Sequence, residues 1–174
     1  MHTIPIQKAT LQDLERLQQI GRQTFFETFA AANTAENMNN YLAENFSREK
    51  LTAELSDPNS EFYFALIGRE VVGYLKLNFG SAQTEFQDGH ALEIERIYVL
   101  KALHGQKVGQ VLYEKALDVA KVSGADYIWL GVWEENTRAI HFYQKNGFVP
   151  FDKHIFKLGD DAQTDIMMKL ELNR

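Results

Sequence analysis

Three observations in the sequence predict one α/β domain with a mixed sheet over residues 1–174. Apolar residues recur at helical spacing in some segments, whereas other segments are rich in β-branched and aromatic residues. Residues 126–132 form a continuous apolar run, which is typical of a strand covered on both faces. The chain has no linker rich in proline, glycine or serine, and ~100–200 residues is the usual length of a single domain.

The first sixty residues predict a strand and three helices. Thr10 followed by Asp13 resembles a capping box, and apolar residues at helical spacing continue to Phe29. Asn33 with Glu36 predicts the start of a second helix. The expected elements are strand 3–8, a helix ending near residue 29, a helix over 34–45, and a helix that Ser47 begins and Asp57-Pro58 ends.

The rest of the chain predicts six strands with two helices between them. Residues 61–67 and 70–78 are joined by Gly68-Arg69, which indicates a hairpin. Gly147 supplies a left-handed stop to the last helix. After the hairpin, the expected elements are strand 90–99, helix 108–123, strand 126–132, helix 136–146 and strands 148–157 and 163–171.

Strand 90–99 contains an irregularity. Its apolar residues fall at Leu92 and Ile94 and then at Ile97 and Val99, so the alternation slips by one residue near Glu95-Arg96. A β-bulge would absorb the extra residue and leave backbone groups free for a ligand. A strand partly buried on both faces would show the same pattern.

The segment after this strand, residues 103–110, is a turn with Gly105 and Gly109 that leads into a helix. Backbone N–H groups at such a turn point to one place at the positive end of the helix dipole, which suits a phosphate or pyrophosphate. The turn matches neither a P-loop nor the dinucleotide fingerprint. Many turns of this kind bind nothing.

The helix after residue 136 carries a second candidate group. Asn136 is a candidate N-cap, and Ala139 and Tyr143 lie four residues apart on one helical face. The small Ala139 would let a ligand approach the Tyr143 hydroxyl. A buried tyrosine with a local partner is the alternative.

Composition excludes several other classes. The chain has no cysteine, so disulfides, thiolate metal sites and cysteine nucleophiles are excluded. Its five histidines are scattered, and no metal site is expected. A net charge of −6 disfavours direct nucleic-acid binding and favours cationic ligands. No apolar run could span a membrane and no secretory signal is visible, so we expect a cytoplasmic protein.

Taken together, residues 92–148 resemble the GNAT superfamily of N-acetyltransferases. The similarity rests on the bulged strand, the Gln106-x-x-Gly109 loop and the segment Asn136…Phe142-Tyr143…Gly147-Phe148. It implies a mostly antiparallel central sheet, splayed at the cofactor site, with helices on both faces. Lys107 and Val111 depart from the family's motif, which prefers small residues at both positions.

The resemblance implies that acetyl-CoA binds between strands 90–99 and 126–132. Its pantetheine would pair with the backbone of Ile97 and Val99, and its pyrophosphate would contact N–H groups of residues 105–110. The implied cofactor-binding residues are Ile97, Tyr98, Val99, His104, Gly105, Gln106, Lys107, Val108, Gly109, Gln110, Asn136 and Tyr143.

Acetyl transfer to an amine requires a neutral nitrogen. A primary ammonium has a pKa of ~10.4, so its neutral form costs about 4.6 kcal/mol at pH 7. Glu95 matches the position of the glutamate base in polyamine acetyltransferases of the superfamily, and we expect its pKa to be raised or a water to relay the proton. Glu93 is the second choice, and an ion-paired Glu95 beside Arg96 is the alternative.

Tyr143 is the candidate acid for the leaving thiolate. Full proton transfer from a tyrosine to a thiolate is uphill by roughly 2 kcal/mol, so a strong hydrogen bond is the better expectation. The backbone N–H of Val99 would polarise the carbonyl.

Two further regions resemble the bacterial Pai-type spermidine/spermine N-acetyltransferases, namely residues 24–42 and 151–165. This resemblance implies a small cationic amine as substrate and places Glu27, Glu36 and Tyr41 at the acceptor site. Solvated helix charges are the alternative for the two glutamates. The runner-up functions are a peptide or protein N-acetyltransferase and a regulator that responds to CoA or polyamine. A homodimer through strand 163–171 is a further expectation.

Overall fold

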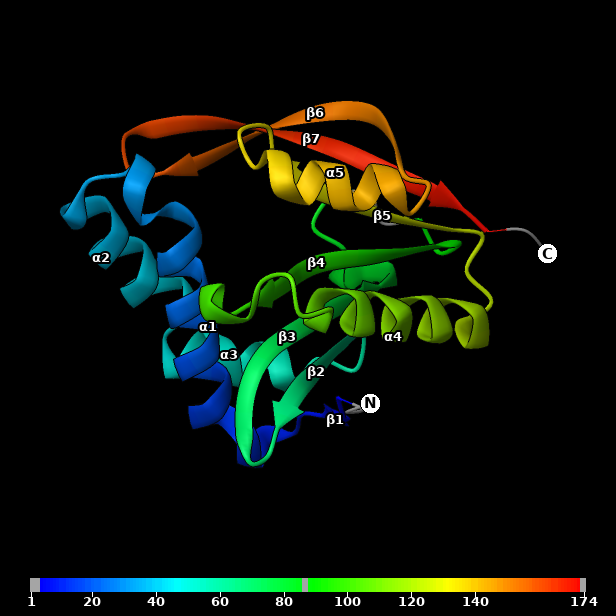
Figure 1. Ribbon diagram of the computed structural model, residues 1–174, viewed down its shortest axis with the longest axis horizontal. Helices are drawn as coiled ribbons and strands as arrows, with labels where there is room; N and C mark the ends of the chain where they lie inside the picture. The colour runs from blue at the N-terminus through cyan, green and yellow to red at the C-terminus, as the bar shows by residue number, and fades with distance from the viewer. Residues whose placement is uncertain (1–3, 86–87, 173–174) are drawn as a thin grey trace.

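The computed structural model describes residues 4–85 and 88–172, and within them seven strands form one mixed sheet (Figure 1). The strands are β1 (Ile6–Lys8), β2 (Ser60–Ile67), β3 (Glu70–Phe79), β4 (Ala91–Val99), β5 (Tyr127–Trp133), β6 (Val149–Leu158) and β7 (Asp161–Glu171). They lie in the order β1-β2-β3-β4-β5-β7-β6. All neighbours are antiparallel except β4 and β5, which are parallel.

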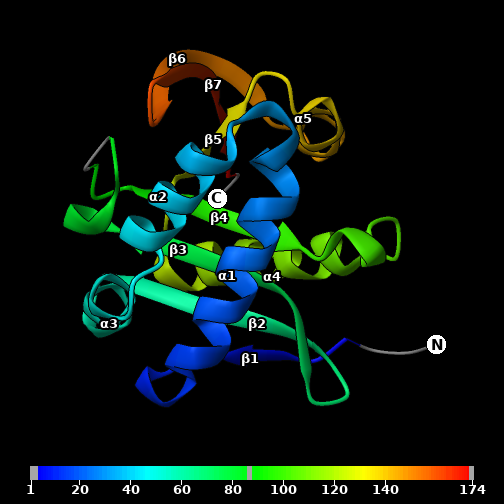
Figure 2. The same ribbon diagram turned by 90° about the vertical axis from the view of Figure 1, so that its left-hand side faces the viewer.

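Helices cover both faces of the sheet. They are α1 (Leu14–Phe29), α2 (Ala35–Asn45), α3 (Arg48–Ser56), α4 (Val108–Ser123) and α5 (Thr137–Lys145). Figure 2 shows α1 and α3 in front of the strands and α4 behind them. Each layer buries its own apolar cluster against the sheet, one from α4 and α5 and the other from α1, α2 and α3. The predicted mixed α/β fold with helices on both faces is therefore confirmed.

Local side-chain caps explain where the helices begin. The side chains of Thr34, Ser47 and Asn136 each accept a hydrogen bond from a backbone N–H in the first turn of α2, α3 and α5. Thr10 and Asp13 form the predicted capping box, on a short 3₁₀ turn that leads into α1. None of the helices in the described ranges is both long and apolar enough to cross a bilayer.

The predicted elements differ from the observed ones mainly at their ends. The N-cap of α2 is Thr34 rather than Asn33, because the Thr34 hydroxyl accepts a hydrogen bond from the Asn37 N–H at 3.1 Å. Strand β1 begins at Ile6, and residue 3 of the predicted strand lies outside the described residues. Strand β7 begins at Asp161, so the turn of the last hairpin is Gly159-Asp160.

Strand β4 contains the predicted bulge. Arg96 pairs with Lys76 and Ile94 pairs with Leu77, so Glu95 is an extra residue with no partner in the register. As a result, Leu92, Ile94, Ile97 and Val99 all contact the apolar cluster under α4. The bulge thus keeps the apolar residues on one face and turns Glu95 out of the ladder.

Beyond the bulge, β4 parts from β5. The two strands pair only from Ala91 to Ile94 and from Tyr127 to Leu130. Residues 95–99 continue on β3, whereas residues 131–133 continue on β7. The sheet is therefore splayed in its middle, as predicted, and backbone groups on the facing edges of both strands are left without a ladder partner among the described residues.

Candidate active site

A cavity of about 990 Å³ opens where β4 and β5 part. One side of it, the loop half, is lined by the 103–110 turn, α5 and the end of β4. Its members include His104, Lys107, Gly109, Asn136 and Tyr143. The other side, the carboxylate half, is lined by side chains of α1, α2, β4, β5, β6, β7 and the loop at residue 85. Its acidic and basic members are Glu85, Glu93, Glu95, Arg96, His154 and Asp165.

The turn before α4 is shaped to present backbone N–H groups. Gly105 has φ +85°, and Lys107, the residue before the helix, has φ 67° and ψ 13°, a left-handed conformation that non-glycine residues rarely adopt. No side chain of the described residues caps α4. The first N–H groups of the helix are therefore available to an anion at its positive end, with the Lys107 charge beside them.

Most of the predicted cofactor-binding residues come together in the loop half. Those that line the cavity are Ile97, Tyr98, Val99, His104, Gly105, Lys107, Val108, Gly109, Gln110, Asn136 and Tyr143. Gln106 does not line it, because its side chain is exposed and its N–H donates to the Leu103 carbonyl at 3.3 Å. Val111 also lies outside the lining, so it does not crowd the cavity.

His104 contacts the end of β4. Its Nε2 lies 3.0 Å from the Val99 carbonyl oxygen, a hydrogen bond if that nitrogen carries the proton. The Val99 carbonyl is one of the groups that the resemblance assigns to pantetheine. His104 therefore holds the same strand end that a bound pantetheine would pair with.

Tyr143 lies on α5 with its ring buried against Phe142 and Phe148, at centroid distances of 5.5 and 5.6 Å. The described residues offer its hydroxyl no hydrogen-bond partner, and the residue lines the cavity. Burial raises the pKa of Tyr143 well above its usual value, with a smaller effect of Tyr113 in the same direction. At neutral pH this hydroxyl is a hydrogen-bond donor and a poor acid, which fits the expected hydrogen bond to a thiolate.

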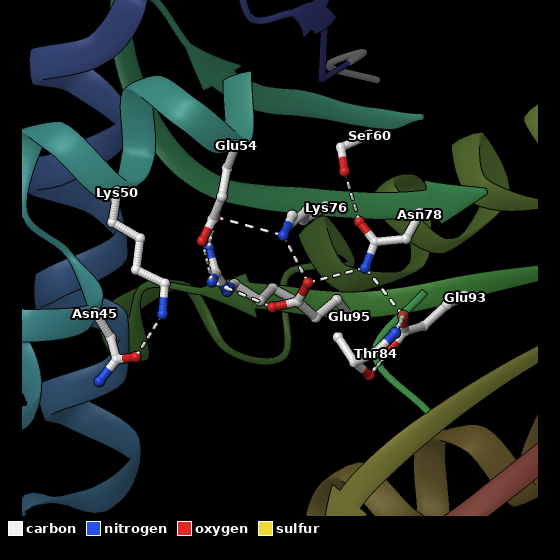
Figure 3. Close-up of polar contacts among 10 residues, drawn as sticks. Asn45, Lys50, Glu54, Ser60, Lys76, Asn78, Thr84, Glu93 and Glu95 are labelled. Atoms are coloured by element: carbon white, nitrogen blue, oxygen red, sulfur yellow. Dashed lines mark hydrogen bonds and ion pairs between the residues drawn. The ribbon is translucent and has the colours of Figure 1, made fainter. Parts of the chain in front are cut away.

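Glu95 is held in a buried ion cluster, shown in Figure 3. It accepts hydrogen bonds from Lys76 at 2.6 Å and Asn78 at 2.8 Å, and its other oxygen lies 3.1 Å from Arg96. Glu54 binds the same two cations, at 3.4 Å from Lys76 and 3.0 Å from Arg96. Two anions and two cations thus neutralise one another beneath the bulge.

This cluster overturns the expectation of a raised pKa for Glu95. Burial acts to raise the pKa, but the charges of Arg96 and Lys76, with hydrogen bonds from Lys76 and Asn78, outweigh it and lower the pKa to about 2. A carboxylate with this pKa is a very weak base for an ammonium group. The ion-paired alternative describes Glu95 correctly.

Glu93, the second choice, is also engaged. Thr84 donates to it from its N–H at 2.8 Å and from its hydroxyl at 2.5 Å, and Asn78 donates at 2.9 Å (Figure 3). Burial raises the pKa of Glu93, although these hydrogen bonds oppose the rise. Its oxygens accept three hydrogen bonds, so Glu93 supports the loop at Thr84 while it lines the cavity, and its role as a base stays a prediction.

The three predicted substrate-binding residues behave differently. Tyr41 lines the cavity, where its ring stacks on Phe25 at 4.4 Å and burial raises its pKa to about 12. Glu27 accepts a hydrogen bond from the Lys101 N–H at 3.0 Å, and Glu36 is exposed in the first turn of α2. Neither glutamate lines the cavity, so the structure does not bring them together with Tyr41, and their role at the acceptor site stays a prediction.

Sequence reasoning missed the contribution of the last hairpin. Asp165 of β7 lies opposite His154 of β6 and Trp133 of β5, and its side chain faces the cavity. His154 in turn pairs with Glu85. A signal was present, because a two-residue turn at Gly159-Asp160 fixes a register in which residues 154 and 165 are opposite.

The described residues contain no group of three or more His, Asp or Glu side chains arranged to hold a metal ion. The polar groups of the cavity include backbone N–H groups and the Tyr143 hydroxyl in the loop half and the carboxylates of the carboxylate half.

Comparison with known proteins gives the class. Residues 15–148 match the family model described as the acetyltransferase (GNAT) family. The chain is 40% identical over 172 residues to an uncharacterised N-acetyltransferase from Lactobacillus delbrueckii subsp. lactis, covering 99% of each chain. It is 27% identical over 171 residues to a spermidine N(1)-acetyltransferase from Thermoplasma acidophilum, covering 96% of each.

A solved structure agrees with these relatives. The PaiA N-acetyltransferase from Thermoplasma acidophilum, in complex with coenzyme A, superposes with a TM-score of 0.80 at 25% identity and covers 98% of this chain and 100% of its own. The chain belongs to the GNAT acetyltransferase family. It is an acyltransferase that uses acetyl-CoA as co-substrate.

Proposed function

We propose that the protein acetylates a primary amine of a polyamine, with spermidine and spermine as the best candidates. The observation that carries the proposal is the make-up of the carboxylate half, where acidic side chains face a wall of aromatic rings. The aromatic members are Phe25, Phe29, Tyr41, Trp133 and Phe156. Such a surface suits a chain in which ammonium groups alternate with methylene segments.

Charge supports the same acceptor. Arg96, a cation of this half, is already neutralised by Glu54 and Glu95, and His154 is paired with Glu85. Asp165 is left without a hydrogen bond or ion pair among the described residues. The acceptor site therefore has a carboxylate without an ion-pair partner and lies in a chain of net charge −6, which attracts a polycation. The spermidine acetyltransferase among the relatives supports this choice of acceptor.

In this proposal the loop half holds acetyl-CoA. The N–H groups of residues 105–110 and the Lys107 side chain would bind its phosphates, and the backbone of Ile97 and Val99 would pair with pantetheine. The Val99 N–H would polarise the carbonyl, and the Tyr143 hydroxyl would donate to the sulfur as it becomes negative.

The test is thiol release from acetyl-CoA with a panel of amines, which comprises spermidine, spermine, putrescine, lysine, a peptide with a free N-terminus and an aminoglycoside. We expect saturable release with spermidine or spermine and a mass increase of one acetyl group on the polyamine. Butylamine is the matched control for putrescine, because it has the same carbon chain and one ammonium fewer. It should bind at least 10-fold more weakly.

Turnover of the peptide with silent polyamines would contradict the substrate while leaving the class unchanged. Tight acetyl-CoA binding with no turnover of any amine would instead favour the regulator.

A further inference from the structure

The carboxylates of the cavity differ in whether they are already engaged. Glu95 binds two cations, Glu93 accepts three hydrogen bonds and Glu85 is paired with His154. Asp165 has no hydrogen bond or ion pair within residues 4–85 and 88–172. Of this set, Asp165 is the one carboxylate that can take a proton without weakening a hydrogen bond or ion pair to a described residue.

Its position places it at the opening between the strands. Asp165 pairs across β7 and β5 with Trp133, and its carboxylate lies over Gly131, so that a Cβ on that glycine would be 3.6 Å from Oδ2. Gly131 is the first residue of β5 beyond the last one that pairs with β4. Because Gly131 has no side chain, this position of β5 leaves the space beside the Asp165 carboxylate open, where the gap that the resemblance assigns to acetyl-CoA begins.

The surroundings tune this carboxylate as a base. Burial raises the pKa of Asp165 to about 6, against a smaller opposing effect of His154 on β6. The other charged or titratable groups near this part of the cavity are Glu85, which pairs with His154, Tyr41 from α2, and Glu95 and Arg96 from β4. At pH 7 most of Asp165 is ionised, yet its raised pKa makes it a stronger base than Glu95, whose pKa is lowered.

We propose that Asp165 is the catalytic base, which takes a proton from the acceptor ammonium at the gap between β4 and β5. The inference rests on the proposed function only in requiring a cationic amine as acceptor. The ammonium gives one proton to Asp165, and the freed nitrogen forms the new C–N bond with the acetyl carbon. The C–S bond breaks, the second proton of the nitrogen passes to the CoA sulfur, and Asp165 releases its proton to water.

The test is Asp165→Asn, with Asp160→Asn in the adjacent turn as the matched control. With a polyamine at pH 7 we expect kcat of Asp165→Asn to fall at least 100-fold and that of Asp160→Asn to stay within twofold. The wild-type rate should level off above about pH 6, where Asp165 is ionised. The rate of Asp165→Asn should continue to rise about tenfold per pH unit towards the amine pKa, because this variant can use only the neutral amine.

A weakly basic arylamine separates a base from a binding group. It is neutral at pH 7, so Asp165→Asn should acetylate it within about fivefold of the wild-type rate. A variant with a raised KM, an unchanged kcat and an unchanged pH profile would show that Asp165 only binds the ammonium, and this would overturn the proposal. Equal acetyl-CoA affinity of both variants checks that the fold is intact.

Failure of the polyamine assignment is distinguishable from failure of this inference. If a peptide or another amine proves to be the acceptor, the same pH profiles are measured with it, and the expected loss is unchanged. Carbon-detected NMR titration of the Asp165 carboxyl needs no acceptor at all. A titration near 3.9, the ordinary value for aspartate, would overturn the proposal whatever the substrate.

Discussion

The two halves of the cavity are built in different ways. The loop half comes from one stretch of chain, the end of β4 through α5, and it offers backbone N–H groups together with Lys107 and Tyr143. The carboxylate half collects side chains from α1, α2, β4, β5, β6, β7 and the loop at residue 85, whose positions span most of the chain. A site made of backbone is specified by a short motif, whereas a site made of side chains depends on how distant segments align.

The difference extends to stability. In the carboxylate half the ion cluster of Glu54, Lys76, Glu95 and Arg96 is buried and each member needs its partners. In the loop half the polar groups are exposed or open to the cavity. We therefore expect substitutions in the first half to affect folding and those in the second to affect binding and rate.

The largest expected effect is that of Glu95→Gln. It leaves Lys76 and Arg96 with one anion instead of two, and breaking a buried ion network costs about 3–5 kcal/mol of the free energy of unfolding. Urea unfolding at pH 7 measures it, with the exposed Glu44→Gln as a control that should change by less than about 0.5 kcal/mol.

The pH dependence of this effect has a definite sign. The pKa of Glu95 is lowered in the folded protein, so its contribution is complete above the unfolded value of 4.5 and is lost as the pH falls through about 2. The stability difference between wild type and Glu95→Gln should therefore shrink between these two values. A loss below about 1 kcal/mol at pH 7 would show that the cluster does not depend on Glu95.

The next effect is on the reaction rate. Tyr143→Phe removes the hydroxyl that lines the loop half, and the loss of one donor to a developing negative charge lowers kcat by roughly 100-fold. The affinity for acetyl-CoA and the unfolding free energy should change little, because the hydroxyl has no partner in the described residues. Tyr113→Phe, which alters a tyrosine of the same apolar cluster away from the cavity, is the control. A fall in kcat of less than threefold would remove Tyr143 from the mechanism.

The smallest effect concerns Lys107→Gly. Lys107 has φ 67°, and this left-handed conformation costs a lysine roughly 1–2 kcal/mol. Glycine relieves that strain but loses about 0.5–1 kcal/mol because its unfolded chain has more conformational entropy. We expect the free energy of unfolding of the variant to be higher by about 0.5 kcal/mol. We also expect it to bind CoA several-fold more weakly at low salt, and this difference in affinity should shrink as the ionic strength rises. Calorimetric titration at two salt concentrations measures this, with Lys121→Ala as the control. A lower free energy of unfolding for Lys107→Gly than for the wild type would contradict the claim that Lys107 is strained.

The loop half could be predicted from the sequence far better than the carboxylate half. The slip of alternation at Glu95-Arg96 located the bulge, and Gly105, Gly109 and Asn136 located the loop and the cap of α5. These features depend on residues close together in the chain.

The carboxylate half could not be predicted in this way. Glu95 lies at the position expected for a base, but the buried ion cluster that includes Lys76 and Glu54 holds it as an ion-paired carboxylate. These two residues come 19 and 41 residues earlier in the chain. The hydrogen bond of Glu27 could not be predicted, because its partner, the Lys101 N–H, lies 74 residues away. Asp165 becomes visible only once the register of β5, β7 and β6 is known.

The parting of β4 and β5 has one more consequence. It leaves two unpaired strand edges inside the sheet, and free edges are where a foreign strand can add and aggregation can begin. A ligand that pairs with residues 95–99 covers one of these edges. A ligand that binds only the folded chain also raises the free energy of unfolding, by about 2.7 kcal/mol when its concentration is a hundred times its Kd. The resistance of this fold to unfolding and aggregation is therefore coupled to the supply of its own co-substrate.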